Sequence, residues 1–395
     1  MSERVVKPVG RGFLFLDSHP AGCAKVVRDL AAAVQPVVEP RAPEEAPVAL
    51  VIGSSSGYGL ATTIAGLTAF GVKGVGVAFE KDATARRTAT AGWYRTAETA
   101  KLADELGRNF TFVNADAFAD TTKDEVLDLI AERFGKIDHL IYSVAAPRRT
   151  DPRTGETYQS ALKTIGSPYT TKSLAYDGAE PQLTEVTVDP ATDDDLAQTV
   201  KVMGGEDWAR WVTALQERDL MSEDFNTVAL TYIGSDITGP IYRQGSIGAA
   251  KADLEQTALR LTKEGIRAYT SVNGAAVTQA SSAIPGIGLY TSLLHKTLGD
   301  AMQTPIQQSV SLWNQLTGTP DDLDEDNRIR LDRWELTPDV QAQVHAAWQA
   351  VTQDTIADLA DHEWFYTEIR RLYGFDVEGI NYEAEVEVDV PWPAK

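Results

Sequence analysis

Cysteine is almost absent from this chain of 395 residues, and Cys23 is the only one. A single thiol cannot form an intrachain disulfide, and it cannot supply a cysteine-based zinc site. Such low cysteine usage is typical of proteins that work in a reducing compartment. We therefore expect a cytoplasmic protein with no bound metal.

Long apolar runs and an excess of positive charge are also lacking. No segment approaches the roughly 20 apolar residues that cross a bilayer, and the first residues lack the order of a secretory signal, so we expect no membrane span and no secretion. The 57 acidic residues outnumber the 36 basic ones, and a formal charge of −21 disfavours nucleic acid and anionic lipid as partners. A polyanion would need a local basic pocket. Arg148, Arg149 and Arg153, or Lys163 and Lys172, are candidates, although scattered basic residues are also ordinary surface.

Apolar segments of strand length alternate with segments of helix length over most of the chain. The predicted strands span 48–52, 75–79, 110–114, 139–144, 227–233 and 269–272. The predicted helices span about 59–70, 97–106, 123–134 and 206–216, and another follows Ser246. Continuous apolar strands between helices are typical of a parallel sheet covered on both faces. We therefore predict an α/β protein with an enlarged Rossmann fold.

Several segments lie outside this alternation. Residues 11–17 predict a short strand, and the Pro- and Glu-rich residues 36–49 predict a turn or linker. Residues 148–195 predict a long irregular excursion, and the chain after about residue 288 is mostly helical, with an acidic turn at 321–326. We expect one structural unit of three parts: an N-terminal strand and helix extension packed on the core (1–46), a Rossmann core with a substrate-side insertion at about 148–205 (47–287), and a mainly helical substrate cover (288–395).

A glycine cluster lies between the first long strand and its helix. The segment VALVIGSSSGYGLA places Gly53, Gly57 and Gly59 there, where backbone N–H groups can approach a pyrophosphate at the helix N-terminus. A tight turn with close helix packing would need the same glycines, but the strand–turn–helix context favours a nucleotide site. The G-x3-G-x-G spacing is the arrangement found in short-chain dehydrogenases, so we expect a sheet of that type.

Polar and small residues follow the next strands. Glu80 ends the second strand, 21 residues after Gly59, where a carboxylate would bind the ribose hydroxyls and repel a 2′-phosphate. This position favours NADH over NADPH, although Glu80 is also interpretable as a solvated acid beside Lys81. Asp116 is a candidate for binding adenine, and Ala145 with Ala146 for passing close to the ribose. A packing role explains these last three residues equally well.

Two tyrosines and a lysine follow the apolar strand at 227–233. Tyr242 and Lys251 are nine steps apart, about 2.5 helical turns, so they cannot share one face of a straight helix. Pro240 and Gly245 indicate instead that Tyr242 lies in a loop and that Ser246 helps to start the helix. Tyr242 can then fold back toward the ammonium group.

An ammonium group beside Tyr242 would favour the phenolate and lower the pKa of this tyrosine, which improves it as a proton donor. Lys251 is also a candidate for binding the nicotinamide ribose, and Tyr232 is a second candidate hydroxyl. The alternatives are a packed aromatic residue at position 232 and a solvated helix residue at position 251.

Longer strings carry a resemblance to a known family. GSSSGYGLA, FEK, GWYRTAE, YSVAAPRRTDPRTGE, VKVMGGEDW, VTQASSAIP and the Tyr-x8-Lys segment resemble the FabV-type trans-2-enoyl-CoA and enoyl-acyl-carrier-protein reductases. The likeness extends from RGFLFLDSHPAGC to RLDRWELTPDVQ, nearly the whole chain. It implies a monomer that reduces enoyl-CoA or enoyl-acyl-carrier-protein thioesters with NADH.

The resemblance also implies roles for individual residues. The catalytic set is Tyr242, Lys251 and Tyr232. The expected cofactor contacts are Gly53, Ser54, Ser55, Gly57, Tyr58, Gly59, Phe79, Glu80, Asp116, Ala117, Ala145, Ala146, Lys251, Val277, Thr278 and Gln279. The expected substrate contacts are Tyr232, Ala280, Ser281, Ile284 and Leu289, with SSAIP starting a helix that borders the acyl pocket.

The chain departs from the family pattern at four positions. Gly274 stands where a lysine is expected, and Gly286, Gly288 and His295 stand where bulkier or apolar residues are usual. These departures bear on the preferred chain length of the substrate. We interpret His295 as a wall residue of the pocket.

The predicted chemistry is addition of hydride to the β-carbon of a conjugated thioester. Tyr242 hydrogen-bonds the carbonyl oxygen that gains charge, Lys251 holds the phenol and the ribose, and Tyr242, Tyr232 or water supplies the α-carbon proton. Two alternatives stay open at the level of sequence. One is a carbonyl reductase using the same tyrosine, and the other is an NADH-binding regulatory protein without turnover.

Overall fold

The computed structural model describes residues 3–34, 46–177, 180–321 and 323–394. Most of the predicted linker at 36–49 lies outside the described residues. Seven parallel strands form the central sheet, in the order β14-β13-β12-β7-β4-β5-β6. They span Arg328–Arg330 (β14), Arg267–Val272 (β13), Met221–Thr231 (β12), Ile137–Tyr142 (β7), Val48–Ile52 (β4), Lys73–Ala78 (β5) and Phe110–Asn114 (β6). The α/β fold with a Rossmann-like parallel sheet is confirmed.

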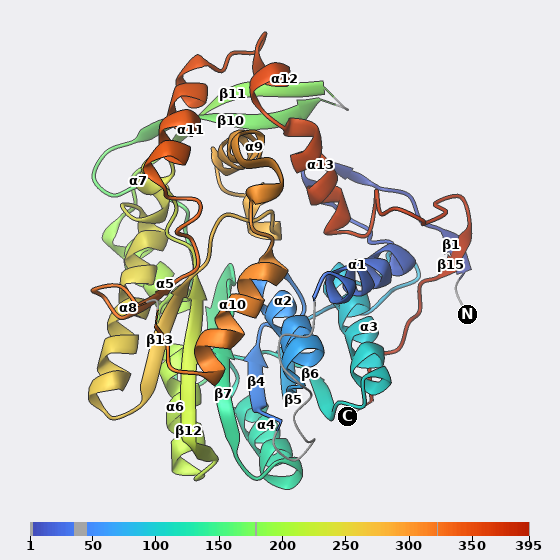
Figure 1. Cartoon of the computed structure of the whole chain (residues 1–395), viewed down its shortest axis with the longest axis vertical. Helices are drawn as coiled ribbons and strands as arrows, with labels where there is room; N and C mark the ends of the chain where they lie inside the picture. The colour runs from blue at the N-terminus through green and yellow to red at the C-terminus, as the bar shows by residue number, and fades with distance from the viewer. Residues whose placement is uncertain (1–2, 35–45, 178–179, 322, 395) are drawn as a thin grey trace.

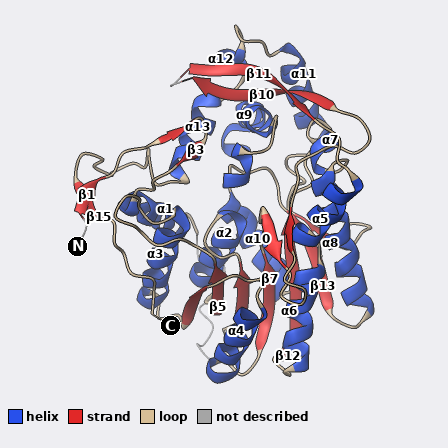
Figure 2. Cartoon of the chain, turned by 180° about the vertical axis from the view of Figure 1, so that it is seen from behind, coloured by secondary structure: helices blue, strands red, loops and turns tan. Residues whose placement is uncertain are grey.

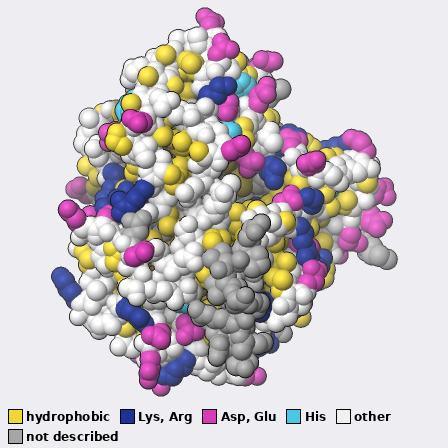
Figure 3. Space-filling model, in the orientation of Figure 1, with side chains coloured by type: hydrophobic (Ala, Val, Ile, Leu, Met, Phe, Trp, Pro, Cys, Tyr) yellow, Lys and Arg dark blue, Asp and Glu magenta, His cyan; other side chains and the backbone are white. Residues whose placement is uncertain are grey.

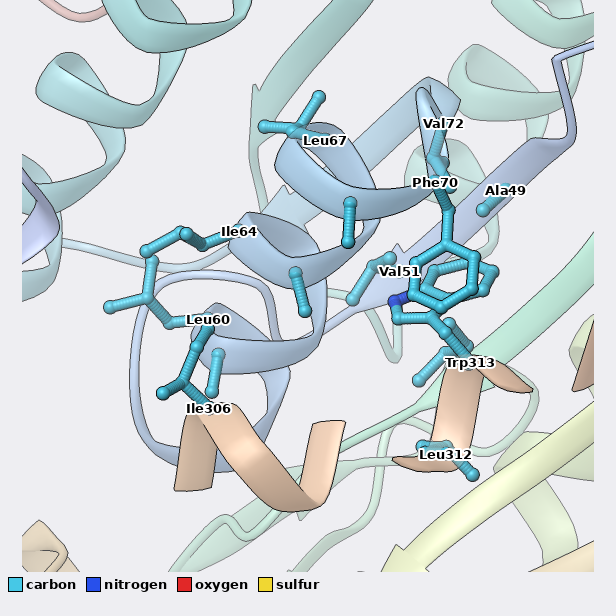
Figure 4. Close-up of a cluster of buried hydrophobic side chains, with 14 of the residues drawn as sticks. Ala49, Val51, Leu60, Ile64, Leu67, Phe70, Val72, Ile306, Leu312 and Trp313 are labelled. Atoms are coloured by element: carbon cyan, nitrogen blue, oxygen red, sulfur yellow. The ribbon is translucent and has the colours of Figure 1, made fainter. Parts of the chain in front are cut away.

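Helices cover both faces of this sheet (Figures 1 and 2). The helices of this part of the molecule are α2 (Gly57–Ala65) with the π-helical turn η2 (Gly66–Phe70), α3 (Ala91–Glu105), α4 (Asp120–Arg133), α5 (Asp193–Met203), α6 (Glu206–Glu217), α7 (Gly239–Tyr242), α8 (Ser246–Lys263) and α10 (Pro305–Thr317). Successive side chains of a strand point to opposite faces, so β4 belongs to two clusters. Ala49 and Val51 pack under α2 and α10, where Trp313 fills the space (Figure 4). Val48, Leu50 and Ile52 pack toward α4, α6 and α8.

The chain order of the strands reverses at β4, which pairs with β5 on one side and β7 on the other. In open α/β sheets such a switch point creates a crevice at the carboxyl ends of the strands, where ligands bind. The loops after β4, β7 and β12 therefore carry the residues most relevant to function.

A second layer lies beyond this end of the sheet, at the top of Figure 1. It contains a long antiparallel hairpin, β10 (Tyr169–Asp177) with β11 (Glu180–Val188), and the helices α9 (Ile287–Leu298), α11 (Pro338–Ala350), α12 (Ile356–Leu359) and α13 (His362–Arg371). Their apolar side chains share one buried cluster with Tyr232, Tyr242 and Ile247. The cover over the crevice is therefore packed onto it.

The remaining elements are short, except for one helix. They are β1 (Glu3–Val5), β2 (Gly10–Arg11), β3 (Leu14–Phe15), α1 (Pro20–Ala32), β8 (Arg148–Thr150), β9 (Thr157–Gln159), the 3-10 turns η3 (Gln279–Ser282) and η4 (Gly299–Ala301), and β15 (Glu385–Glu387). The strand β1 pairs with β15, so the first and last strands of the described chain lie side by side near α1 (Figure 1). Acidic side chains are spread over the face seen in Figure 3, with Lys and Arg between them.

The long irregular excursion predicted for residues 148–195 was wrong. The segment 148–195 contains the hairpins β8–β9 and β10–β11 and the start of α5, because cross-strand pairs such as Thr170 with Thr187 stabilise strands that show little apolar periodicity. The helix that follows β4 begins at Gly57 and ends as a π-helical turn. The division of the chain at residues 46 and 287 remains a prediction.

Candidate active site

The loop from Gly53 to Gly57 brings β4, α2 and β7 into close contact. A Cβ atom on Gly53, whose φ is +88°, would lie 2.1 Å from the carbonyl oxygen of Ser143, and one on Gly59 would lie 2.1 Å from the carbonyl oxygen of Gly53. Both glycines are thus required by packing. Gly57 differs, because only Thr278 lies within 4 Å of its added Cβ, at 3.8 Å. The start of α2 is therefore open enough for a phosphate group to approach its free N–H groups.

A cavity of about 970 Å³ runs from this loop across the carboxyl ends of the strands. Most of the predicted site residues line it. These are Gly53, Ser55, Gly57, Tyr58, Phe79, Asp116, Ala117, Ala145, Ala146, Tyr232, Tyr242, Lys251, Thr278, Gln279, Ala280, Ser281 and Ile284. Its volume is in the range of cofactor and small-molecule sites.

Five predicted site residues do not line this cavity. Ser54 is buried and its hydroxyl donates to the carbonyl oxygen of Val77, and Gly59 packs on the loop. Val277 and Leu289 join the apolar cluster behind the wall. Leu289 does not line the cavity because α9 directs its side chain into the core, whereas Ile287, two residues earlier, faces the cavity.

Glu80 is the fifth. Its carboxylate accepts hydrogen bonds from the hydroxyls of Ser55, at 2.6 Å, and Thr90, and it lies against Gly92, where an added Cβ would be 2.0 Å from its Oε1. Ser55 itself lines the cavity. The carboxylate is thus fixed directly behind the glycine-rich loop, and the absence of a side chain at position 92 makes room for it.

Tyr242 and Lys251 lie on separate helices that meet at the cavity. Tyr242 ends the one-turn helix α7, and α8 begins four residues later at Ser246. The Lys251 Nζ lies 5.8 Å from the ring centroid of Tyr242 and donates a 3.0 Å hydrogen bond to the hydroxyl of Thr231. Because the chain changes direction between α7 and α8, the two side chains can meet although they would lie on opposite faces of one straight helix.

One detail of that prediction was wrong, because Tyr242 is helical rather than in a loop. Ser246 is the first residue of α8, as predicted, with Gly245 as the cap residue before it. The hydroxyl of Ser246 donates to the carbonyl oxygen of Ala161 and accepts from the N–H of Lys163. Ser246 thus ties the insertion after β7 to the start of α8.

The electrostatics of the pair also differ from expectation. Burial, reinforced by the negative charge of Glu335, raises the pKa of Tyr242 instead of lowering it. Burial and the positive charge of Arg243 lower the pKa of Lys251 to about 8. Desolvation disfavours each charged form, so Tyr242 is a neutral phenol that can donate a hydrogen bond at neutral pH.

Tyr232, at the end of β12, packs its ring against that of Tyr242, with centroids 4.8 Å apart and planes at 89°. Its hydroxyl donates a 2.8 Å hydrogen bond to Oε1 of Glu335. Glu335 was not anticipated from the sequence, although it lies within the string RLDRWELTPDVQ. A glutamate in the turn before α11 gave no signal, because its burial depends on contacts with Tyr232, Ala275 and Tyr290, which are distant in sequence.

Other residues of the cavity were missed for a similar reason. They are apolar or small, and they reach the site only through the fold. They include Ser143, Thr150, Thr157, Met203, Leu230, Thr231, Ile247, Ala275 and Ile287. A second cavity of about 470 Å³ lies beyond Ser281 and Ile284, between β10 and the start of the chain.

Most of the basic residues considered for a polyanion-binding pocket bind other groups of the protein instead. Arg149 is buried and donates to the carbonyl oxygen of Lys201, and Lys163 pairs with Asp195 at 2.8 Å. The Nζ of Lys172 binds carbonyl oxygens at the end of α11. Arg148, by contrast, is exposed and lines the large cavity. These residues therefore do not form one shared basic pocket.

The departures from the family pattern have local explanations. A Cβ on Gly274 would lie 2.3 Å from the indole of Trp334, and one on Gly288 would lie 3.1 Å from the ring of Phe365. Gly286 has a φ of +80°, a conformation that favours glycine. The ring of His295 stacks on Trp364 at 3.7 Å, and its Nδ1 lies 2.7 Å from Asp361. The interpretation of His295 as a pocket wall was wrong, since it lines neither cavity.

Among the described residues, no group of three or more His, Cys, Asp and Glu side chains is placed to hold a metal ion. Within that same part of the chain, every helix is too short or too polar to cross a membrane.

Three family models match successive parts of the chain. Residues 5–85 match the NAD(P)H binding domain of trans-2-enoyl-CoA reductase, residues 87–317 match the trans-2-enoyl-CoA reductase catalytic region, and residues 323–386 match the enoyl reductase FAD binding domain.

Individual relatives match over the whole length. A Streptomyces avermitilis enoyl-acyl-carrier-protein reductase that uses NADH is 59% identical, covering 98% of this chain and 100% of its own. A Clostridium perfringens trans-2-enoyl-CoA reductase that uses NADH is 43% identical, covering 97% and 99%. The crystal structure of Treponema denticola trans-2-enoyl-CoA reductase in complex with NAD has a TM-score of 0.91 at 39% identity, covering 97% of this chain and 98% of that one.

The flavin in the description of the third model does not fit the residues found there. Residues 323–386 contribute the edge strand β14 and helices α11 to α13. None of them lines either of the two cavities above, and side chains such as Val344 and Phe365 are fully buried in the apolar cluster of the cover.

Proposed function

The chain belongs to the family of trans-2-enoyl-CoA and enoyl-acyl-carrier-protein reductases, and on that premise we propose how its residues carry out the reaction. The protein is an oxidoreductase that reduces the carbon–carbon double bond of a trans-2-enoyl thioester with NADH. The observation that supports the assignment of roles is that Tyr242, Lys251 and Tyr232 line one cavity with the glycine-rich loop.

The cofactor end of the cavity fits a dinucleotide. The open N-terminus of α2 at Gly57 receives the pyrophosphate, and Asp116 and Ala117, after β6, lie where the adenine would rest. Glu80, fixed by Ser55 and Thr90 next to the cavity wall, would repel a 2′-phosphate and would bind the ribose hydroxyls if a bound cofactor displaces one of these two partners. Thr278 and Gln279 border the nicotinamide, which when bound supplies a hydride to the β-carbon of the substrate.

The catalytic end of the cavity is arranged to stabilise negative charge on the thioester oxygen. Tyr242 is a neutral phenol and donates a hydrogen bond to that oxygen as charge develops. A donor fixed in advance in a buried site is worth about 3 to 4 kcal/mol of barrier. Lys251, held by Thr231, keeps an ammonium group beside the phenol and binds the ribose. Ala280, Ser281 and Ile284 form the wall along the acyl chain.

We further propose that the protein is a cytoplasmic monomer. The single cysteine is buried, and the net charge of −21 favours solubility and opposes self-association. Light scattering coupled to size-exclusion chromatography tests the oligomeric state.

Absorbance at 340 nm, which follows NADH oxidation, tests the function. Crotonyl-CoA and an enoyl-acyl-carrier protein should each drive oxidation, and acetoacetyl-CoA should not. A matched experiment with butyryl-CoA, the expected product, controls for oxidation that does not depend on the double bond. Turnover with acetoacetyl-CoA but not with crotonyl-CoA would identify a carbonyl reductase, and NADH binding without turnover would identify a binding protein.

A further inference from the structure

A buried carboxyl group lies directly behind the catalytic wall. Glu335 is inaccessible to solvent, and its side chain accepts three hydrogen bonds. The hydroxyls of Tyr232 and Tyr290 each lie 2.8 Å from Oε1, and the N–H of Ala275 lies 2.6 Å from Oε2. All three donors are neutral, so the cost of burying a charge here is not offset by a cation. The carboxyl group also touches the cavity wall on two sides, since Tyr232 and Ala275 both line the cavity.

The three donors are not equivalent. The side-chain amide of Gln341 donates to the Tyr290 oxygen at 3.1 Å and to the Glu335 carbonyl oxygen at 2.7 Å, which fixes the orientation of the amide. Tyr290 accepts a hydrogen bond from Gln341 and does not line the cavity, so it has no access to a substrate there. The N–H of Ala275 can only donate. If Glu335 takes up a proton, Tyr232 can turn from donor to acceptor, and it is the hydroxyl partner that lines the cavity and can pass its own proton into it.

We propose that Glu335 is the proton reservoir for Tyr232, and that Tyr232 delivers the α-carbon proton of the reduced product. This inference rests on the proposed function. Glu335 acts only through Tyr232 and is therefore a positioning residue rather than a catalytic one.

The proton transfers balance. Hydride addition at the β-carbon leaves an enolate, which Tyr242 stabilises at oxygen. The O–H bond of Tyr232 breaks as a C–H bond forms at the α-carbon, and the O–H bond of Glu335 breaks as the O–H bond of Tyr232 forms again. Glu335 is left as a carboxylate with three donors, the arrangement seen in the structure. It regains a proton through Tyr232, which lines the cavity, once water enters the cavity after product release. One proton is consumed in each turnover.

The surroundings of Glu335 raise its pKa close to neutral pH, so that the side chain can both hold and release a proton there. Burial raises the pKa of Glu335 to about 7, opposed by the hydrogen bonds from Tyr290, Ala275 and Tyr232. The other titratable groups facing it are Tyr58 on α2, Tyr242 on α7 and Asp332 on its own segment, which Arg330 holds at 2.8 Å. As pH rises through 7, the reservoir empties and the proton of Tyr232 is held in a hydrogen bond to the Glu335 carboxylate.

Single-turnover rates of enzyme preloaded with NADH and mixed with crotonyl-CoA test the proposal, from about pH 6 to about pH 9. Glu335→Gln keeps the size and hydrogen-bonding capacity of the side chain but has no acidic proton. We expect this variant to be about 100-fold slower than wild type at pH 6, and the two rates to converge as pH rises. The ratio of the two rates cancels any effect of Lys251. A ratio that stays constant with pH, or is near one at pH 6, overturns the proposal.

Tyr290→Phe is the matched control for Tyr232→Phe, because each removes one 2.8 Å phenol bond to the same oxygen. Tyr290 does not line the cavity. Its loss should leave the rate at pH 6 near that of wild type and move the fall in rate to higher pH, because a hydrogen bond to the carboxylate is gone. If the pH at which the rate has fallen by half is the same in Tyr290→Phe and wild type, the proposal is overturned, even if Glu335→Gln fails to fold. If wild type does not turn over with crotonyl-CoA at any pH, the function itself fails.

Discussion

The hydroxyl-bearing rings of Tyr232 and Tyr242 meet at right angles, with centroids 4.8 Å apart, and they are held by different partners. Tyr232 ends a central strand and is anchored to Glu335 at 2.8 Å. Tyr242 lies on a one-turn helix and faces Lys251. Two phenols in contact can thus perform two tasks, one at the carbonyl oxygen and one at the α-carbon.

Replacing Lys251 by Met should stabilise the protein at neutral pH and reduce its turnover. Burial lowers the pKa of Lys251 to about 8, so below that pH the folded protein carries the full cost of a buried ammonium group. This cost disappears as pH rises from about 8 toward the ordinary lysine value. Thermal unfolding without NADH should show a higher Tm for Lys251→Met at pH 7, and the gain should vanish near pH 10.5.

Lys263→Met, at the exposed end of the same helix, is the control and should show no pH-dependent gain. Turnover of Lys251→Met should fall at least tenfold. A variant that is less stable than wild type at pH 7, or as active, contradicts this role.

Removing the carboxylate of Glu80 should shift the cofactor preference. Glu80→Ala deletes the group that we expect to bind the ribose and repel a 2′-phosphate. The ratio of kcat/KM for NADPH to that for NADH should rise at least tenfold, about 1.4 kcal/mol. Asp82→Ala removes an exposed acid two residues away and should leave the ratio unchanged. An equal ratio for both variants rejects the assignment.

Gly274→Ala should destabilise the fold without any contact to the substrate. Its Cβ would lie 2.3 Å from the indole of Trp334, and overpacking of this kind typically costs about 1 to 3 kcal/mol. Denaturant unfolding measures the loss. Gly239→Ala is the control, because nothing lies within 4 Å of a Cβ there. If Gly274→Ala and wild type unfold at the same denaturant concentration, Trp334 moves aside at no cost and the prediction is wrong.

Local patterns in the sequence were sufficient for the central fold and for most of the cavity. Apolar strands, helix-length spacing and the glycine cluster are properties of short segments, and each is found near its predicted place. The pairing of Tyr242 with the glycine-rich loop was accessible too, because the carboxyl ends of parallel strands meet at one edge of a sheet.

Features that depend on distant contacts were not accessible. The hairpin β10–β11 is stabilised by cross-strand Thr pairs rather than by apolar alternation. The pKa of Tyr242 is raised by burial and by Glu335, which lies more than 40 residues later in the sequence. Glu335 in turn is held by Tyr290 on α9, which is 45 residues earlier. No spacing rule connects such positions.

The most direct test of the account is the single-turnover rate of Tyr242→Phe with NADH and crotonyl-CoA. We expect this rate to fall at least about 100-fold, with an unchanged Kd for NADH, measured by cofactor fluorescence. Tyr94→Phe is the control, since this buried tyrosine bonds to the backbone of Ala89 and Val388 and none of the three lines the cavity, so the variant should turn over like wild type. A rate for Tyr242→Phe within about threefold of wild type would contradict the account.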